Sequence, residues 1–572
     1  MSENRTLEPL PDNAKEFMDW PWDRIEPHFQ KLADTEVTQE NIATWMSEWS
    51  RLTALIDERS SRIYVAITVD TGDAEAEAAH NRFLDEILPH AMTWDQKLKE
   101  QVLATGLTMP GMELQFRKLR TEAEIFCKEN VPLVAQERKV STEYDKITGS
   151  QTIEFDGEEK TLTQLAPVYQ ETDRGRREQA FRLAMGRGLQ DREALNELYA
   201  RLLKMRLQMA ENAGFDNYID FRWKAMLRFD YSPDDCRLFH DAIEEAVVPA
   251  AGRIYEKRRK ALGVEKLRPW DLDVDELSRN ALRPFSDTNV LIRKTADVFR
   301  RLHPTTAAYF RHMVDHDLLD LDNRKGKAPG GYCINFEVEG VPFIFMNATG
   351  VHRDVQTLLH ESGHSFHTFQ ANKLPLLFQR EVGMEFAEVA SMSMELLAAP
   401  YLSGGDDPFY SREEAARARI QHLEKNILFW PYMAVVDGFQ HWVYANPDES
   451  IDAKNCDAKW SQLWDRFMPG VDWTGFEDAK ATGWHRKLHI FHIPFYYVEY
   501  GLAQLGAVQV WKHSLEDEEA AVRDYLAALE LGGTADLPGL FSAAGARFAF
   551  DASVLRESVE LMEKTIDELE NV

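Results

Sequence analysis

Cysteine is scarce in this chain, with four residues among 572. They lie far apart, so no two form the Cys-x-x-Cys pair of a redox motif or of a cysteine-rich zinc site. Their spacing also argues against a disulfide framework and is compatible with a reducing compartment. The four are Cys127, Cys236, Cys333 and Cys456.

Long apolar runs are absent as well. No segment approaches the roughly 18 consecutive apolar residues that indicate a membrane-spanning helix. Residues 1–17 also lack the basic stretch followed by an apolar stretch that defines a secretory signal peptide. We therefore expect a soluble, cytoplasmic protein with no membrane partner.

Positive charge is in deficit. Lysine and arginine number 66 against 96 aspartates and glutamates, which gives a net charge of −30. A negative field repels phosphate backbones, so nucleic acid is not expected as a partner. A peptide or a cation suits such a protein better.

Most of the sequence has helical periodicity. In residues 191–214, Leu195, Leu198 and Leu202 recur at steps of three and four, and Gly214 follows as a helix stop. The chain exceeds the roughly 100–200 residues of an ordinary domain, so two or three packed units are expected. We predict a mainly α-helical fold with a domain boundary near residue 180.

Two stretches interrupt the helical pattern. Residues 151–162 place Asp156-Gly157 between short β-prone runs, which predicts a hairpin. Residues 324–350 begin with a glycine-rich part, followed by an alternating segment at 333–338 and an apolar run at 341–346. This second stretch predicts a pair of strands that leads into a helix.

That helix, predicted over residues 354–370, contains a His-Glu-x-x-His motif. His360 and His364 are four residues apart, so both rings project from one face. They can bind one Zn²⁺ at about 2.0–2.1 Å, while Glu361 beside them can take a proton from water. With 17 histidines, the motif arises by chance in roughly one of twenty such chains, so two ordinary helix histidines stay an alternative.

His367 is the nearest candidate for a third ligand, but it lies about 10.5 Å further along the helix axis than His360. It also stands where the metzincin pattern requires glycine, and Gln370 stands at the last histidine of that pattern. The third ligand is therefore expected from another helix, which leaves a fourth position for water.

A helix predicted over residues 380–398 offers carboxylates for this purpose. A solvated acidic face would have the same spacing, but the interleaved apolar residues leave little of this helix free to face water. Buried carboxylates need a cation. The spacing does not choose between Glu385 and Glu388. The carboxylates of the stripe are Glu381, Glu385, Glu388 and Glu395.

These motifs and several further segments resemble one family. HESGH at 360–364 and FAEVASMSME at 386–395 are similar to the thimet-oligopeptidase-like zinc metallopeptidases, most closely their oligoendopeptidase F-type branch. The resemblance covers roughly residues 140–560. With the boundary placed shortly after the predicted hairpin, near residue 180, we expect an N-terminal helical lobe over 1–180 and a zinc metallopeptidase catalytic domain over 181–572. Further similar segments are RKGKAPGGYC, PFIFMN, NILFWPYMAVVDGFQHWVY and LHIFHIPFYYVEYGLAQ.

The resemblance also implies roles for the site residues. His360, His364 and Glu388 would bind zinc, one ion per chain, and Glu361 would be the general base. Glu395 matches an acid outside the ligand set that would orient His364 or a neighbouring ligand.

His489, Tyr497 and Tyr500 match positions that line the substrate side in this family. Tyr496 is adjacent, and a shift of one residue would exchange it for Tyr497. Aromatic residues at such density more often form core, but a zinc hydrolase needs donors for a developing oxyanion, which a phenol or an imidazole can supply. The segment at 328–347 would line the peptide groove and bind substrate backbone by strand addition.

The resulting hypothesis is zinc-dependent hydrolysis of internal peptide bonds in short oligopeptides, by metal-bound water with Glu361 as general base. Carboxypeptidase action stays open. The implied fold is a two-lobed helical ellipsoid with a deep substrate channel and a small β-sheet beside the HExxH helix.

Two other hypotheses stay open. A di-metal oxidoreductase in a helical bundle would combine Glu361 and His364 with a second Glu-x-x-His pair at Glu77 and His80. A catalytically silent peptide-binding homologue would have no need of Glu361.

Overall fold

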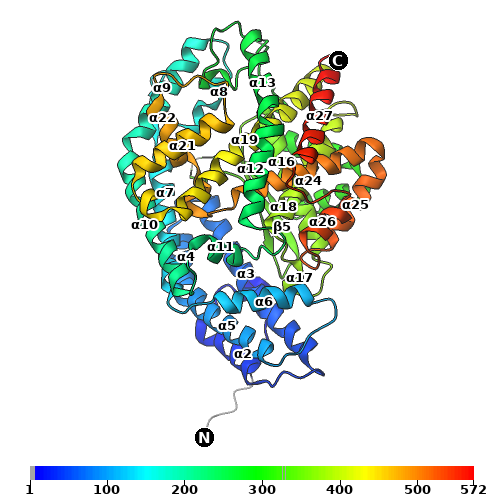
Figure 1. The fold of residues 1–572 in the computed structure, drawn as a ribbon. Coiled ribbons are helices and arrows are strands. Elements are labelled where there is room, and N and C mark those ends of the chain that lie inside the picture. The colour runs from blue at the N-terminus through cyan, green and yellow to red at the C-terminus, as the bar shows by residue number, and fades with distance from the viewer. Residues whose placement is uncertain (1–6, 278, 325, 329) are drawn as a thin grey trace. The chain divides into compact units, whose positions relative to one another are not determined.

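The computed structural model describes residues 7–277, 279–324, 326–328 and 330–572 (Figure 1). Residues 325 and 329 of the glycine-rich segment lie outside the described residues. By its internal contacts the chain divides into two compact units, each assembled from separate stretches. The first is Met1–Lys128, Arg283–Ala415 and Gly506–Phe548; the second is Glu129–Leu282, Ala416–Leu505 and Ala549–Val572.

The first unit contains the N-terminal helices, a three-stranded sheet and the helices that follow it. Its elements are α1 (Ala14–Phe17), α2 (Trp22–Asp34), α3 (Ile42–Val69), α4 (Ala74–Arg82), a π-helical turn (Phe83–Ile87), α5 (Leu88–Ala104), α6 (Glu113–Ile125), α14 (Thr288–Leu302), α15 (Pro304–Asp315), β3 (Leu319–Asp322), β4 (Tyr332–Phe336), β5 (Val341–Ala348), α16 (His352–Ala371), α17 (Leu377–Arg380), α18 (Met384–Ala398), α25 (Glu518–Glu530) and α26 (Leu537–Ala543).

The second unit is helical apart from one hairpin. Its elements are α7 (Asn130–Gly149), β1 (Thr152–Phe155), β2 (Glu158–Thr161), α8 (Ala166–Tyr169), α9 (Arg174–Gln190), α10 (Arg192–Asn212), α11 (Tyr218–Ala225), α12 (Pro233–Ala246), α13 (Val248–Ala261), α20 (Pro447–Ser450), α21 (Ala453–Phe467), α22 (Glu477–Ala481), α23 (Leu488–His492) and α27 (Ala552–Leu569). Two helices, α19 (Arg412–Ala445) and α24 (Tyr497–Glu516), begin in one unit and end in the other.

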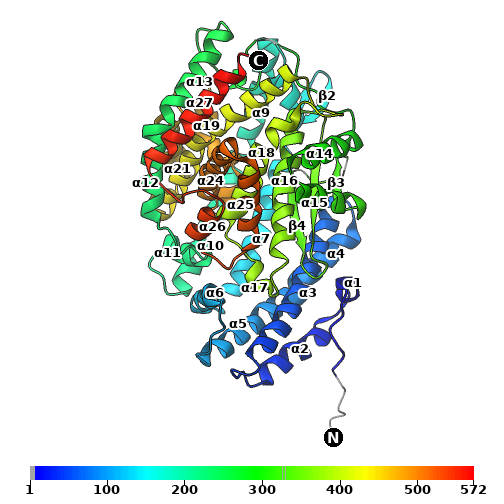
Figure 2. The same ribbon diagram turned by 90° about the vertical axis from the view of Figure 1, so that its right-hand side faces the viewer.

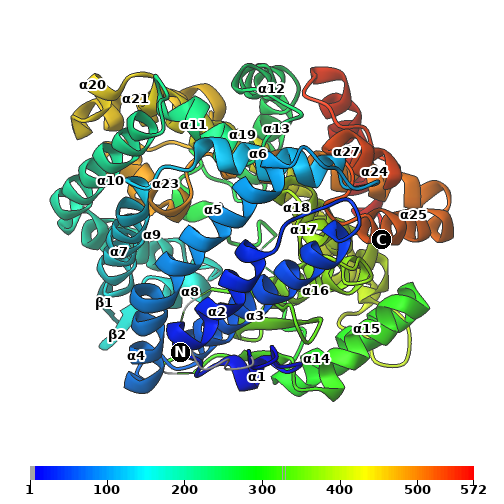
Figure 3. The same ribbon diagram turned by 90° about the horizontal axis from the view of Figure 1, so that it is seen from below.

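The N-terminal helices α2, α3, α5 and α6 pack around a tryptophan-rich core (Figure 3). Trp45 and Trp49 of α3 are buried in it, and the ring of Trp49 lies 4.7 Å from that of Phe378 in α17. This contact joins the start of the chain to the segment directly before α18. The N-terminal helices thereby support one of the two helices that build the site described below.

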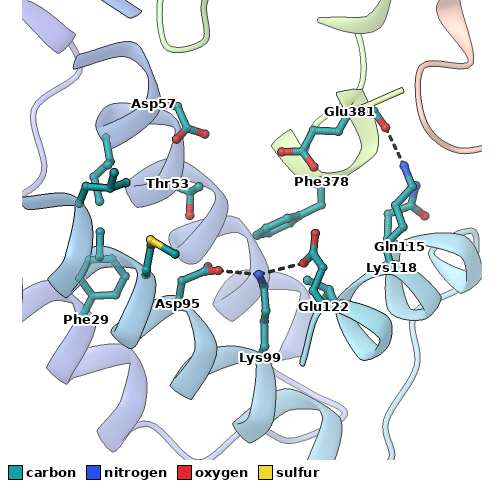
Figure 4. Close-up of a pocket in the computed structure, with 15 residues that line it drawn as sticks. Phe29, Thr53, Asp57, Asp95, Lys99, Gln115, Lys118, Glu122, Phe378 and Glu381 are labelled. Carbon is teal, nitrogen blue, oxygen red and sulfur yellow. Dashed lines mark hydrogen bonds and ion pairs between the residues drawn. The ribbon is translucent and has the colours of Figure 1, made fainter. Parts of the chain in front are cut away.

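A cavity of about 190 Å³ lies among these helices (Figure 4). Asp57 of α3 and Glu381, which follows α17, both point toward it. On the same lining, Lys99 bridges Asp95 and Glu122 at 2.6 and 2.8 Å. Burial raises the pKa of Asp57 to about 8, with the carboxylate of Glu381 as the next cause, and burial raises the pKa of Glu381 to about 7.

The sheet of the first unit has the order β3-β5-β4. β4 pairs antiparallel with β5, with Cys333 opposite Ile344, so the predicted strand pair is confirmed. β3 pairs parallel with β5 and was not predicted, because its four residues, Leu-Asp-Leu-Asp, are too few and too acidic to stand out. α16 packs against β4 and β5, as Figure 2 shows for β4.

The predicted elements of the second unit are also confirmed. β1 and β2 form the hairpin, with positive φ angles at Asp156 and Gly157 that fit an Asp-Gly turn. The helix predicted over 191–214 is α10, and Gly214 after it has φ 79°.

The mainly α fold with a small sheet beside the HExxH helix is thus confirmed. Within the part of the chain that the structure describes, no helix combines the length and apolar composition needed to cross a membrane. The substrate channel and the division into 1–180 and 181–572 stay predictions.

The raised pKa of Asp57 predicts a pH-dependent stability. The folded protein keeps a proton on Asp57 that the unfolded chain loses above about pH 4, so the free energy of unfolding falls as pH rises from about 4 to about 8. Asp57→Asn removes this ionisation. Urea unfolding at pH 5 and pH 8 should therefore show a smaller loss of stability in Asp57→Asn than in the wild type. Asp12→Asn, at an exposed side chain of the same unit, should follow the wild type; equal losses in all three proteins would contradict the assignment.

Candidate active site

α16 holds the His-Glu-x-x-His motif on a helix whose start is fixed. The carboxylate of Asp354, in the first turn, accepts hydrogen bonds from the backbone N–H groups of Thr349, Gly350 and Val351 at 2.7 to 3.0 Å. The rings of His360 and His364 lie side by side, with centroids 5.0 Å apart. The helical spacing therefore aims both imidazoles to the same side.

The second helix of the site, α18, crosses α16 at Gly363. A Cβ atom at this glycine would lie 2.5 Å from Cα of Ser391 and 2.6 Å from the carbonyl oxygen of Ala390. Both neighbours are backbone atoms, so they cannot move aside as a flexible side chain would. Sequence reasoning did not single out Gly363, although a glycine inside a helix signals a close backbone approach.

Because of this crossing, Glu388 faces the two histidines. The ligand atoms of His360, His364 and Glu388 all lie within 4.8 Å of one another. Oε2 of Glu388 is 3.3 Å from Nε2 of His360 and 3.7 Å from Nε2 of His364. The hydroxyl of Ser391 donates to the same oxygen at 3.0 Å and fixes its direction.

These spacings fit a bound zinc ion. Ligands about 2.0 Å from a tetrahedral ion lie about 3.3 Å from one another. Two imidazoles and one carboxylate are also an established zinc donor set that leaves a position for water. The structure thus brings together the three residues that the family resemblance implied, and of the two carboxylates that the spacing left open it places Glu388 rather than Glu385 in the group.

Glu395 lies seven residues after Glu388 on α18. Its carboxylate accepts a hydrogen bond from Nδ1 of His360 at 2.7 Å. The resemblance implied that Glu395 orients His364 or a neighbouring ligand, and the ligand beside it is His360. A proton on Nδ1 leaves Nε2 of the ring as the free lone pair, directed toward Glu388. The pair therefore sets the tautomer that a metal ligand needs.

Glu361 is buried beside these groups, with 7% of its surface exposed. Burial raises its pKa to about 7, while the neighbouring His360 acts to lower it. It belongs to no group of ligand atoms among the described residues. Its position next to the donor set, rather than in it, is what a general base requires.

The remaining candidates of the two helices lie elsewhere. The helix predicted over 380–398 is α18, which begins only at Met384, so Glu381 lies before it. Glu385 is buried in the first turn of α18. His367 is buried and lies against Phe386, away from the donor set, as the helix geometry predicted.

Glu77 and His80, the second pair of the di-metal hypothesis, lie on α4. They join no group of metal-ligating side chains among the residues that the structure describes.

His489 and the three tyrosines form one aromatic cluster in the second unit. The ring of His489 lies 5.6 Å from Tyr496, 5.2 Å from Tyr497 and 5.7 Å from Tyr500. Lys487 donates to the hydroxyl of Tyr497 at 2.7 Å. Tyr497 is 5% exposed, whereas Tyr500 is half-buried.

Phe495 directly precedes the three tyrosines of this cluster. Its φ of 66° is unusual for a bulky residue. Its N–H donates to the side chain of Gln440 at 2.8 Å, and its carbonyl accepts from Arg228 at 2.6 Å. Arg228 also forms a buried ion pair with Glu499 at 2.7 Å. Sequence reasoning missed Arg228 and Gln440, because only the folded chain brings them to this turn.

Two profiles of known families match most of the chain. The profile of Peptidase family M3 matches residues 168–560, and that of the Peptidase M3 N-terminal domain matches residues 16–109.

Two curated relatives have low sequence identity to this chain. An oligoendopeptidase F homolog of Borreliella burgdorferi is 23% identical over 290 residues, which is 50% of this chain and 48% of that protein. The chromosomal oligoendopeptidase F of Lactococcus lactis subsp. cremoris is 22% identical over 392 residues, or 66% of this chain and 62% of that protein. The matches therefore span about half to three-fifths of these relatives.

Solved structures match over nearly the whole length. PZ peptidase A, solved with an inhibitor, is 28% identical at a TM-score of 0.89 and covers 96% of this chain and 97% of its own. Oligoendopeptidase F from Enterococcus faecium is 17% identical at a TM-score of 0.63, covering 98% and 99%, and shows likeness of fold alone.

The close crossing at Gly363 predicts that Gly363→Ala separates α16 from α18. The added methyl group meets backbone, so we expect a loss of about 1–3 kcal/mol in the free energy of unfolding and a marked loss of zinc affinity. Thermal unfolding and metal content after dialysis measure the two effects. Gly252→Ala in α13, where a Cβ meets nothing within 4 Å, is the matched control and should be neutral or stabilising; equal behaviour of both variants would contradict this role for Gly363.

Proposed function

Because the chain belongs to peptidase family M3, we propose that it is a zinc-dependent endopeptidase that cleaves short oligopeptides. The observation that supports this most directly is the convergence of Nε2 of His360, Nε2 of His364 and Oε2 of Glu388, with Glu361 buried beside them. When bound there, zinc supplies a Lewis acid for the scissile carbonyl and lowers the pKa of water.

Glu361 is the proton carrier in this proposal. Its carboxylate takes a proton from the attacking water and later delivers it to the nitrogen of the departing amine. Glu395 keeps the ring of His360 in the tautomer that directs Nε2 to the ligand group. Ser391 keeps the carboxylate of Glu388 aimed at the same point.

The substrate backbone is proposed to bind along β4. Among the described residues, β4 pairs only with β5 within the sheet, and the substrate backbone would add at its other edge as a further strand. β5 connects this strand directly to the start of α16. A peptide lying along β4 would therefore be held by the same sheet that supports the zinc-binding helix.

The tyrosine cluster is proposed to supply the oxyanion donor. Tyr500 is half-buried, whereas Tyr496 and Tyr497 are only 8% and 5% exposed. We therefore assign the substrate contact to the hydroxyl of Tyr500, with His489 beside it and Tyr497 supporting it from below the surface.

The general base is tested by Glu361→Gln. This variant should keep its zinc, since Glu361 is not a ligand, and should lose nearly all hydrolysis of internally quenched peptides. Glu385→Gln removes another buried carboxylate of the same unit and should retain activity. Substantial hydrolysis by Glu361→Gln would refute the assignment. Peptides of graded length, assayed with and without a chelator, show whether cleavage is internal and metal-dependent.

The oxyanion donor is tested by three tyrosine-to-phenylalanine variants. Tyr500→Phe should lower kcat on the order of a hundredfold, with KM and zinc content little changed. Tyr497→Phe and Tyr496→Phe should lower it less. A larger loss in Tyr496→Phe than in Tyr500→Phe would move the assignment to Tyr496.

A further inference from the structure

A second cluster of metal-ligating side chains lies in the other compact unit, where α12 and α19 both contribute. Cys236 and His240 are one turn apart on α12, and Asp437 and His441 are one turn apart on α19. Cys236 and Asp437 are fully buried, and His240 and His441 are 5% and 6% exposed. None of these residues belongs to the proposed peptidase site.

Three of the four residues converge. The ligand atoms of Cys236, Asp437 and His441 all lie within 4.8 Å of one another. Nε2 of His441 is 3.3 Å from Oδ2 of Asp437, the same separation as between His360 and Glu388. It equals the spacing of about 3.3 Å between two ligands of one tetrahedral zinc ion.

Several polar atoms in this cluster lack hydrogen bonds. Neither ring nitrogen of His441 has a hydrogen bond of good geometry, although Nε2 lies 3.3 Å from Oδ2 of Asp437. Oδ1 of Asp437 has none either. Leaving a buried polar atom unpaired costs free energy of folding. A cation between these atoms would remove that cost at several of them together.

The surroundings keep water away from the cluster. The ring of His441 lies 5.0 Å from that of Phe495 and 5.7 Å from that of Trp223. His240 is hydrogen-bonded through Nε2 to Oδ2 of Asp437 at 2.8 Å. His240 thus orients the carboxylate from outside the group, as Glu395 orients His360 in the first unit.

We propose that Cys236, Asp437 and His441 form a second metal site, separate from the peptidase centre and suited to Zn²⁺. A thiolate, an imidazole and a carboxylate together select a borderline-soft ion over Mg²⁺ or Ca²⁺. The site ties α12 to α19. Its role is structural: Gln440, directly before His441, accepts the hydrogen bond from Phe495, so the ion stabilises the helix that holds the start of α24.

Cobalt substitution distinguishes the two sites. The peptidase donor set contains no sulfur, so a thiolate-to-cobalt charge-transfer band in the near ultraviolet can come only from the second site. Full-length protein reconstituted with Co²⁺ should show this band. The band should survive the double change His360→Ala/His364→Ala and disappear in Cys236→Ser.

Cys456→Ser is the matched control. Cys456 is also fully buried in the second unit, but its thiol donates to the carbonyl of Ser450 at 3.1 Å and joins no ligand group among the described residues. This variant should keep the band. A band that persists in Cys236→Ser would overturn the proposal.

Metal content gives an independent measurement on the unaltered protein. After zinc loading and desalting, the wild type should contain about two zinc ions per chain, and His360→Ala/His364→Ala about one. Zinc should also raise the Tm of that double variant. These measurements also decide if Cys236→Ser does not fold. One zinc ion per wild-type chain and no thiolate band would refute the second site, and Asp437 and His441 would then be only a buried pair.

Discussion

The close packing of α16 on α18 at Gly363 is the constraint on which the proposed centre depends. The two histidines come from one helix and Glu388 from the other, so the donor atoms meet only if the helix backbones nearly touch. Glu388 lies three residues before Ser391, whose Cα faces Gly363, and therefore points to the crossing. Bonds of about 2.0 Å tolerate little displacement, which is why one methyl group at this position matters.

Much of the fold could be predicted from local patterns. Helical periodicity predicted α10 and α16, alternation and glycine placement predicted β4, β5 and the β1–β2 hairpin, and these patterns depend on neighbouring residues only. β3 was missed because four residues give too short a pattern. The helix predicted from residue 380 begins only at Met384, after its N-cap Gly383. The prediction was too early because Glu381 and Glu385 are four residues apart, as in a helix.

The part of the site that depends on neighbouring residues was predictable too. The spacing of His360 and His364 within one helix determines how the two rings lie, whereas the choice between Glu385 and Glu388 depends on which face of α18 meets α16. The partner of Glu395 and the supports of Phe495 likewise involve residues far apart in sequence. Such contacts leave no periodic signature, so resemblance or structure is needed to find them.

The backbone of Phe495 has a further consequence. A bulky residue at φ 66° stores strain on the order of 1–3 kcal/mol, and the hydrogen bonds with Gln440 and Arg228 help to offset it. On warming, we expect this turn to loosen before the helices of the second unit melt. Activity that depends on the tyrosines after this turn should then be lost at a lower temperature than the secondary structure that circular dichroism detects.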